Sequence, residues 1–217
     1  MPDADIAALT ARELIDHYRR KALSPVEVTR DALARIAACE PAINAFVRVE
    51  AESALAAAKA SEARWARAEP AGRLDGLPAT IKDNIDVAGV PSRKGSRTTS
   101  DTPAAADAPA VAHLRAAGAI FLGKTTLPEW GWIGVCHSPL TGVTRNPWHR
   151  DRTTGGSSGG ARRRRCSISA CCISAPTAPA RSVFLPRSLE SLASSRAMAA
   201  SLLIRRRRSA CWRIRGR

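Results

Sequence analysis

Two short segments of the sequence contain residue types that hydrolytic enzymes use. Lys82 ends an apolar run over residues 76–81, where burial would lower the pKa of its amine and let it act as a general base. The second segment carries two hydroxyl groups among four glycines: Gly155, Gly156, Ser157, Ser158, Gly159 and Gly160. Glycine allows positive φ and close backbone approach, so this loop could expose a hydroxyl or point amide N–H groups at an anion.

Each segment taken alone also has a purely structural interpretation. A lysine at a strand end is often a solvated surface cation, and a run of glycine and serine is often a flexible linker. Residues 155–160 lack the lysine of a phosphate-binding loop. Spacing alone therefore leaves the structural and the chemical interpretations open.

The first 160 residues predict a layered frame that could position both segments. Thr10 with Glu13, and Ser24 with Glu27, have capping-box spacing and begin two helices. We expect the first helix to run to about residue 22 and the second to end at Pro41. The later elements are a strand over 45–49, a helix over 52–68, strands over 77–81 and 119–122, and a helix over 107–117 capped by Gly118. This alternation predicts an α/β fold around a largely buried sheet.

The chain joins two different compositions. Of its 217 residues, the first 160 hold 20 basic and 18 acidic side chains, whereas residues 161–217 hold 14 arginines, no lysine and one acidic residue, Glu190. We therefore divide the chain into a domain portion, 1–160, and an Arg-rich tail, 161–217, which we expect to be disordered.

Several classes of site and partner are not expected. The six cysteines have no zinc-binding spacing, and His137 has no metal partner at ligand spacing, so we predict no metal and no other cofactor. No apolar run is long enough to cross a bilayer, and the N-terminus lacks the pattern of a signal peptide. These features favour a cytoplasmic protein with no membrane partner. The sequence leaves the oligomeric state open, and we expect Trp130, Trp132 and Trp148 to be packing residues.

In their order along the chain, these segments resemble the amidase signature family. The matching motifs are Gly-Leu-Pro with Ile-Lys-Asp-Asn-Ile-Asp at 76–86, Gly-Lys-Thr at 123–125 with Pro-Glu at 128–129, Thr-Arg-Asn-Pro-Trp at 144–148, and Gly-Gly-Ser-Ser-Gly-Gly at 155–160. The resemblance covers nearly all of residues 5–160. It implies the N-terminal helices and the start of the mixed, helix-flanked sheet of that fold, left incomplete. It also implies hydrolysis of a small-molecule amide through an acyl-enzyme, with Lys82 as base and Ser157 as the bridging serine after a cis peptide.

The resemblance stops where the family's nucleophile is expected. After Gly160 such proteins continue to a stretch like G-T-D-x-G-G-S-I-R-x-P-A, whose serine attacks the amide and whose backbone amides form the oxyanion hole. Here the nucleophile is absent, and Arg181 stands at its position. If each codon is shifted to begin at the third base of the codon for one residue, residues 175–187 can be reread as T-D-G-A-G-S-I-R-L-P-A. This rereading chooses the third-position bases freely among the synonymous codons of the given residues. We therefore interpret the tail as an out-of-frame translation and predict an inactive product.

Two alternatives remain beside an amide hydrolase. The first is the A subunit of a tRNA-dependent amidotransferase, in which similar chemistry releases ammonia from glutamine. The second is a basic-tailed protein that binds nucleic acid through counterion release. Selected basic tails usually mix lysine with glycine, serine or aromatic residues, whereas this tail has arginine only and scattered cysteines. We therefore expect no specific nucleic-acid partner.

Overall fold

The computed structural model describes residues 6–161 and 173–174, all of which lie in the unit Met1–Val183. The unit Phe184–Arg217 lies outside the described residues, and so does nearly all of the expected Arg-rich tail. The predictions of disorder and of out-of-frame translation for that tail therefore remain predictions.

The first two α-helices begin at the two predicted capping boxes. After a short 3-10 helix, η1 (Ile6–Ala8), come α1 (Ala11–Arg19) and α2 (Pro25–Ile43). At the start of α2, the Glu27 amide donates to the Ser24 hydroxyl at 3.2 Å, and the Ser24 amide donates to the Glu27 carboxylate at 2.7 Å. The same reciprocal pair joins Thr10 and Glu13 before α1. Each box satisfies backbone donors that the first helical turn leaves free.

The predicted end of α2 at Pro41 was wrong, because Pro41 lies inside the last turn. Ile43, two residues later, is buried, and Asn44 ends the helix in the left-handed conformation with its N–H donating to the Glu40 carbonyl. A proline near a helix end disturbs few backbone bonds. Burial of Ile43 and the Asn44 cap keep the final turn helical.

Four strands form the main sheet in the order β1-β3-β2-β8. β1 (Phe46–Val49) runs antiparallel to β3 (Ile120–Thr125), which is parallel to β2 (Pro78–Lys82). β2 in turn pairs in parallel with β8 (Ile173–Ser174). The three predicted strands are present, but β2 reaches Lys82 and β3 reaches Thr125. The register pairs Lys82 with Thr125, so the candidate base lies at the carboxyl ends of two parallel strands.

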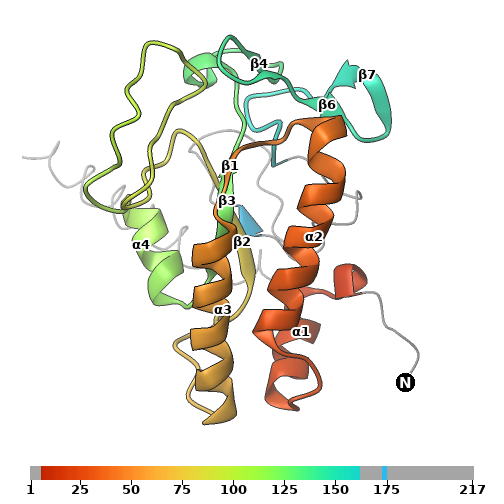
Figure 1. Cartoon of the computed structure of the whole chain (residues 1–217), viewed down its shortest axis with the longest axis vertical. Helices are drawn as coiled ribbons and strands as arrows, with labels where there is room; N and C mark the ends of the chain where they lie inside the picture. The colour runs from red at the N-terminus through yellow and green to blue at the C-terminus, as the bar shows by residue number, and fades with distance from the viewer. Residues whose placement is uncertain (1–5, 162–172, 175–217) are drawn as a thin grey trace, which may run out of the picture. The chain divides into compact units, whose positions relative to one another are not determined.

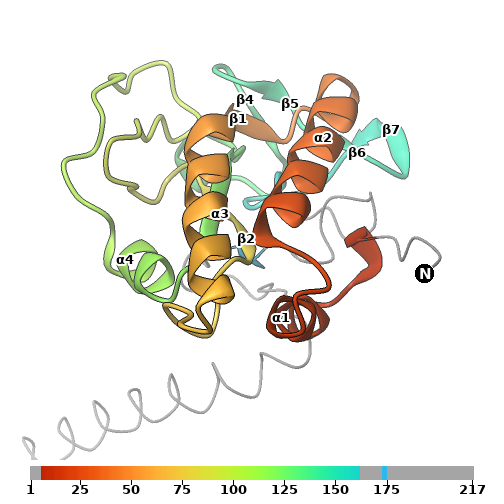
Figure 2. The same ribbon diagram turned by 60° about the horizontal axis from the view of Figure 1, so that its bottom comes forward.

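Helices pack on the sheet through buried apolar side chains. α3 (Ala51–Ala66) lies beside α2 in front of the sheet in both views, and α4 (Pro109–Ala116) lies apart from that pair (Figures 1 and 2). The core shared by α2, α3, β1 and β3 contains Val26, Ala32, Ile36, Ile43, Ala45, Phe46, Ala54, Ala58, Ile120 and Leu122. A second cluster joins Ile81 of β2 to Val111 of α4. These layers establish the α/β fold class.

Short elements follow β3 near the end of the sheet where β2 and β3 finish (Figure 1). They are the 3-10 helix η2 (Glu129–Gly131), the pair β4 (His137–Ser138) and β5 (Gly142–Val143), and the pair β6 (Arg145–Asn146) and β7 (His149–Thr153). The expectation that the tryptophans here are packing residues was wrong: Trp130, Trp132 and Trp148 are 55%, 89% and 69% exposed. Among the described residues, no helix is both long enough and apolar enough to span a membrane.

Candidate functional site

Lys82 occupies a buried position at the end of β2. All five residues of this strand are buried, and Lys82 is 4% exposed. Burial lowers the pKa of the Lys82 amine, and the electrostatic effect of nearby Cys136 acts in the opposite direction. The net lowering makes the neutral amine, which can accept a proton, easier to reach near neutral pH.

Ser157 lies directly opposite the Lys82 amine. The peptide bond between Gly156 and Ser157 is cis, and Gly155 before it has φ +75°. The Lys82 Nζ donates a hydrogen bond to the Ser157 Oγ at 3.1 Å. The structure thus brings together two residues that are 75 positions apart in the sequence, and it supplies the cis peptide that the family resemblance implied.

Close packing explains why glycines end the serine loop. A Cβ on Gly159 would lie 2.1 Å from the Cβ of Cys136 and 2.5 Å from its Sγ. A Cβ on Gly160 would lie 2.5 Å from the Ala45 carbonyl oxygen and 2.7 Å from the Thr126 nitrogen. All of these distances are far below ordinary contact distances. The loop is therefore held against residues 126 and 136 and against the start of β1, and is not a free linker.

Hydrogen bonds tie the surface beneath the serine loop to residues 44 and 45, directly before β1. The Thr126 amide donates to the Ala45 carbonyl at 2.9 Å, and the hydroxyls of Thr126 and Thr144 are 2.7 Å apart. The Thr144 hydroxyl also donates to the Asn44 carbonyl at 2.7 Å. These buried contacts fix the segments against which Gly159 and Gly160 pack.

Three buried groups around Lys82 were missed by sequence reasoning. Cys136 lies close enough to affect the pKa of Lys82, and its thiol contacts the Thr144 hydroxyl at 3.5 Å. Lys124 and Asp83 form a buried ion pair with Nζ and Oδ1 3.7 Å apart. A lysine within the apolar strand 120–125 was the available signal for that pair. No local pattern marks Cys136.

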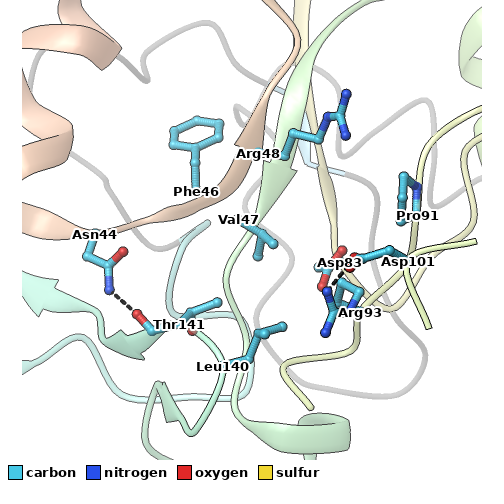
Figure 3. A pocket seen from close by; sticks show the side chains of 10 residues that line it. All are labelled: Asn44, Phe46, Val47, Arg48, Asp83, Pro91, Arg93, Asp101, Leu140 and Thr141. Carbon is cyan, nitrogen blue, oxygen red and sulfur yellow. Dashed lines mark hydrogen bonds and ion pairs between the residues drawn. The ribbon is translucent and has the colours of Figure 1, made fainter. Parts of the chain in front are cut away.

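A cavity of about 460 Å³ opens beside this region and does not include the Lys82–Ser157 pair. Its walls come from the start of β1, from the chain after β2 and from the β4–β5 turn; Figure 3 shows Arg93 between Asp83 and Asp101. An ion pair joins Arg93 to Asp101. Among the described residues, no group of three or more His, Cys, Asp or Glu side chains could hold a metal ion.

Two of the three expected catalytic positions are described. Lys82 and Ser157 are in contact, and Gly155, Gly156, Ser158, Gly159 and Gly160 form the loop around Ser157. Arg181, the residue at the expected nucleophile position, lies outside the described residues. The catalytic roles of Lys82 and Ser157 remain predictions.

Comparison with known proteins decides the family. A family model for amidases matches residues 27–162. This chain belongs to the amidase signature family. It is 40% identical over 152 residues to the glutamyl-tRNA(Gln) amidotransferase A subunit of Salinispora arenicola, covering 70% of this chain and 31% of that protein. It is 43% identical over 138 residues to the indoleacetamide hydrolase of Bradyrhizobium diazoefficiens, covering 64% of this chain and 26% of that protein.

A solved structure agrees with this assignment. The chain resembles a protein from a vestigial complex that reveals the evolutionary origins of an s-triazine catabolic enzyme. The TM-score is 0.68 and the sequence identity is 38%. The match covers 70% of this chain and 34% of that one. The chain thus spans about a third of the length of the proteins it matches, which agrees with an incomplete version of the family's fold.

Proposed function

We propose that the described residues form the proton-transfer half of an amide-hydrolysing site, with Lys82 as general base and Ser157 as bridging serine. The observation that carries the proposal is the 3.1 Å contact between the Lys82 Nζ and the Ser157 Oγ. The lowered pKa of the buried Lys82 amine supports it, because a base must be neutral to accept a proton. The indoleacetamide hydrolase among the relatives supports a small-molecule amide as substrate.

The proposed reaction moves one proton along a chain of three groups. The neutral Lys82 amine takes the proton of the Ser157 hydroxyl while Ser157 takes the proton of an attacking serine hydroxyl. The attacking oxygen bonds to the amide carbon, and the leaving amine departs with the proton returned through Ser157. Water then hydrolyses the acyl ester by the same relay, which restores both serines and the neutral lysine.

We further propose that the chain with this sequence lacks the attacking serine, because Arg181 stands at its position. Residues 161–217 are then an out-of-frame translation, and the shifted reading T-D-G-A-G-S-I-R-L-P-A restores the serine. Loss of the nucleophile from a catalytic triad lowers kcat by several orders of magnitude. The printed chain should therefore show no amide hydrolysis.

The test compares the printed chain with a version corrected by one base near the codons of Gly160 and Ala161. Ammonia release from a panel of aliphatic and aromatic amides should be undetectable for the printed chain and measurable for the corrected one. Lys82→Met and Ser157→Ala in the corrected chain should each lower kcat by at least about 10³-fold. Activity of the printed chain, or full activity of Lys82→Met, would contradict the proposal.

The second candidate is the A subunit of a tRNA-dependent amidotransferase, favoured by 40% identity to such a protein. The same Lys82–Ser157 pair would then serve glutamine, and the ammonia would pass to a partner protein. Glutamine in the amide panel separates the candidates. Preference of the corrected chain for glutamine over indoleacetamide supports the amidotransferase, and the reverse preference supports an independent hydrolase.

A further inference from the structure

Lys124 is a buried lysine to which the proposed reaction gives no part. It belongs to the Gly-Lys-Thr motif at 123–125, lies in β3 and is 1% exposed. Its Nζ donates to the Ile85 carbonyl at 2.8 Å and to the Ser92 hydroxyl at 2.8 Å. The same ammonium lies 3.7 Å from the Asp83 carboxylate. All three partners lie in the chain that follows Lys82.

These contacts hold the turn directly after the candidate base. The Asp83 amide donates to the Thr125 carbonyl at 3.1 Å, which joins the turn to the end of β3. The Ile85 amide donates to the Lys82 carbonyl at 3.0 Å, which closes the turn on Lys82 itself. Ile85 therefore bonds to Lys124 through its carbonyl and to Lys82 through its amide. Movement of Ile85 is thereby coupled to the backbone of Lys82.

Stability alone does not account for these charges. Burial raises the pKa of Asp83, although the Lys124 ammonium and the backbone amides of residues 93–95 oppose that rise. Burial likewise lowers the pKa of Lys124, against the attraction of Asp83 and Asp86. Replacing such a buried pair with apolar residues is often neutral or stabilising. A role in holding geometry explains why a lysine occupies this position.

We infer that Lys124 is a positioning residue: by fixing the turn at 83–85 and the Ser92 hydroxyl, it holds the Lys82 amine against Ser157. This inference rests on the proposed function, in which Lys82 is the base. Two simpler roles for Lys124 must be separated from positioning. The first is an effect on Lys82 through positive charge only, and the second is a contribution to the stability of the fold only.

The experiment measures the pKa of Lys82 in the full chain. The chain has five lysines, Lys21, Lys59, Lys82, Lys94 and Lys124, so selective ¹³Cε labelling gives five NMR signals that single substitutions assign. Lys124→Met keeps the length of the side chain but loses the ammonium. We expect it to raise the pKa of Lys82 by about one pH unit, a tenfold change in acid dissociation constant, because the released amine gains solvent.

A double variant separates positioning from charge. Lys124→Met with Asp83→Asn removes both members of the ion pair, so their charges no longer act on Lys82. The upward shift should persist in this variant, because the bonds to Ile85 and Ser92 are still lost. Return of the pKa of Lys82 to its wild-type value would show that Lys124 acts only through charge and would overturn the inference.

Two controls address stability and folding. Lys59→Met removes an exposed lysine of α3, and Ile36→Val loosens the core beneath α2; both should leave the pKa of Lys82 unchanged, although Ile36→Val lowers Tm. If Ile36→Val shifts the pKa of Lys82 as much as Lys124→Met does, Lys124 contributes only to stability. If Lys124→Met does not fold, Ser92→Ala decides: it removes the hydroxyl that accepts from Lys124 and that itself donates to the Ile85 carbonyl. It should raise the pKa of Lys82, and no change would overturn the inference.

Failure of this inference differs from failure of the proposed function. An ordinary pKa for Lys82 in the wild-type chain would remove the argument that Lys82 is a base, whatever Lys124 does. A lowered pKa in the wild type that stays unchanged in folded Lys124→Met would overturn the positioning role and leave the base in place.

Discussion

Gly159→Ala tests whether close packing of the serine loop creates the candidate site. The added Cβ would lie 2.1 Å from the Cβ of Cys136 and 2.5 Å from the Thr154 hydroxyl. Carbon atoms pack at about 3.5 Å or more, so the loop must retreat by about 1.4 Å. A shift of that size at a position two residues from Ser157 would lengthen the 3.1 Å Lys82–Ser157 contact beyond hydrogen-bonding distance.

The expected loss of stability follows from the same clash. Overpacking of a filled site costs about 1 to 3 kcal/mol. For a chain of this size, that corresponds to a fall in Tm of about 2 to 12 °C. Thermal unfolding of the full chain followed by far-UV circular dichroism measures it. Gly134→Ala is the matched control, because no atom lies within 4 Å of a Cβ at that position, and its Tm should be nearly unchanged.

A compensating change shows which contact is responsible. Cys136→Gly removes both atoms of Cys136 that the new Cβ would meet. In combination with Gly159→Ala it should leave the protein more stable than the sum of the two single changes predicts, by about 1 to 2 kcal/mol. Simple additivity, or a Gly159→Ala variant as stable as Gly134→Ala, would refute the argument that this contact sets the position of the loop.

Three further changes test other parts of the unit by urea unfolding. Asp75→Asn should lower the free energy of unfolding by about 2 to 3 kcal/mol, because it breaks the pair of hydrogen bonds from partly exposed Arg64 to a buried carboxylate. Burial by itself would raise the pKa of Asp75, but the bonds from Arg64 and the Ala71 amide hold that pKa below 3.8. The stability that this carboxylate contributes is therefore present above pH 3.8 and is lost as pH falls through the folded pKa. A free energy of unfolding that does not fall over this pH range would contradict this. Lys82→Met should weaken the rise in the free energy of unfolding between neutral pH and pH 10.5. Because the pKa of Lys82 is lowered in the folded chain, the unfolded chain binds one more proton in that window, and stability rises with pH. An unchanged slope of unfolding free energy against pH in Lys82→Met would count against the lowered pKa. Ser24→Ala should lower the free energy of unfolding by about 1 kcal/mol, because the α2 cap is lost. A negligible change would show that the cap does not stabilise the chain.

Local rules were sufficient where the forces act over a few residues. The capping boxes before α1 and α2 could be predicted because a hydroxyl and a carboxylate three residues apart meet at any helix start. The prediction failed at Pro41, where burial of Ile43 outweighs the local effect of proline. It also failed at Trp132, because aromatic character alone does not say whether neighbouring chain covers a side chain.

The candidate site depended on a different kind of information. Lys82 and Ser157 could be paired only through the motif resemblance, since no spacing rule connects two residues so far apart in the chain. Cys136 and Lys124 were missed because their importance arises from tertiary contacts: one approaches Lys82 from a loop, and the other reaches across from β3. Sequence patterns indicate which residues have suitable chemistry, whereas burial and proximity become visible only in the folded chain.

Most of the described contacts that position the Lys82–Ser157 pair come from residues 44–160, and the pairing of β2 with β8 adds residues 173–174. Thr126 and Cys136 support the serine loop, and Lys124 holds the turn after Lys82. We expect these contacts to organise the pair even in a chain that lacks the nucleophile. An inactive chain with a lowered pKa at Lys82 would therefore have kept the arrangement of the pair and lost the stretch that supplies the attacking serine and the oxyanion hole. An inactive chain with an ordinary pKa at Lys82 would have lost the arrangement of the pair itself.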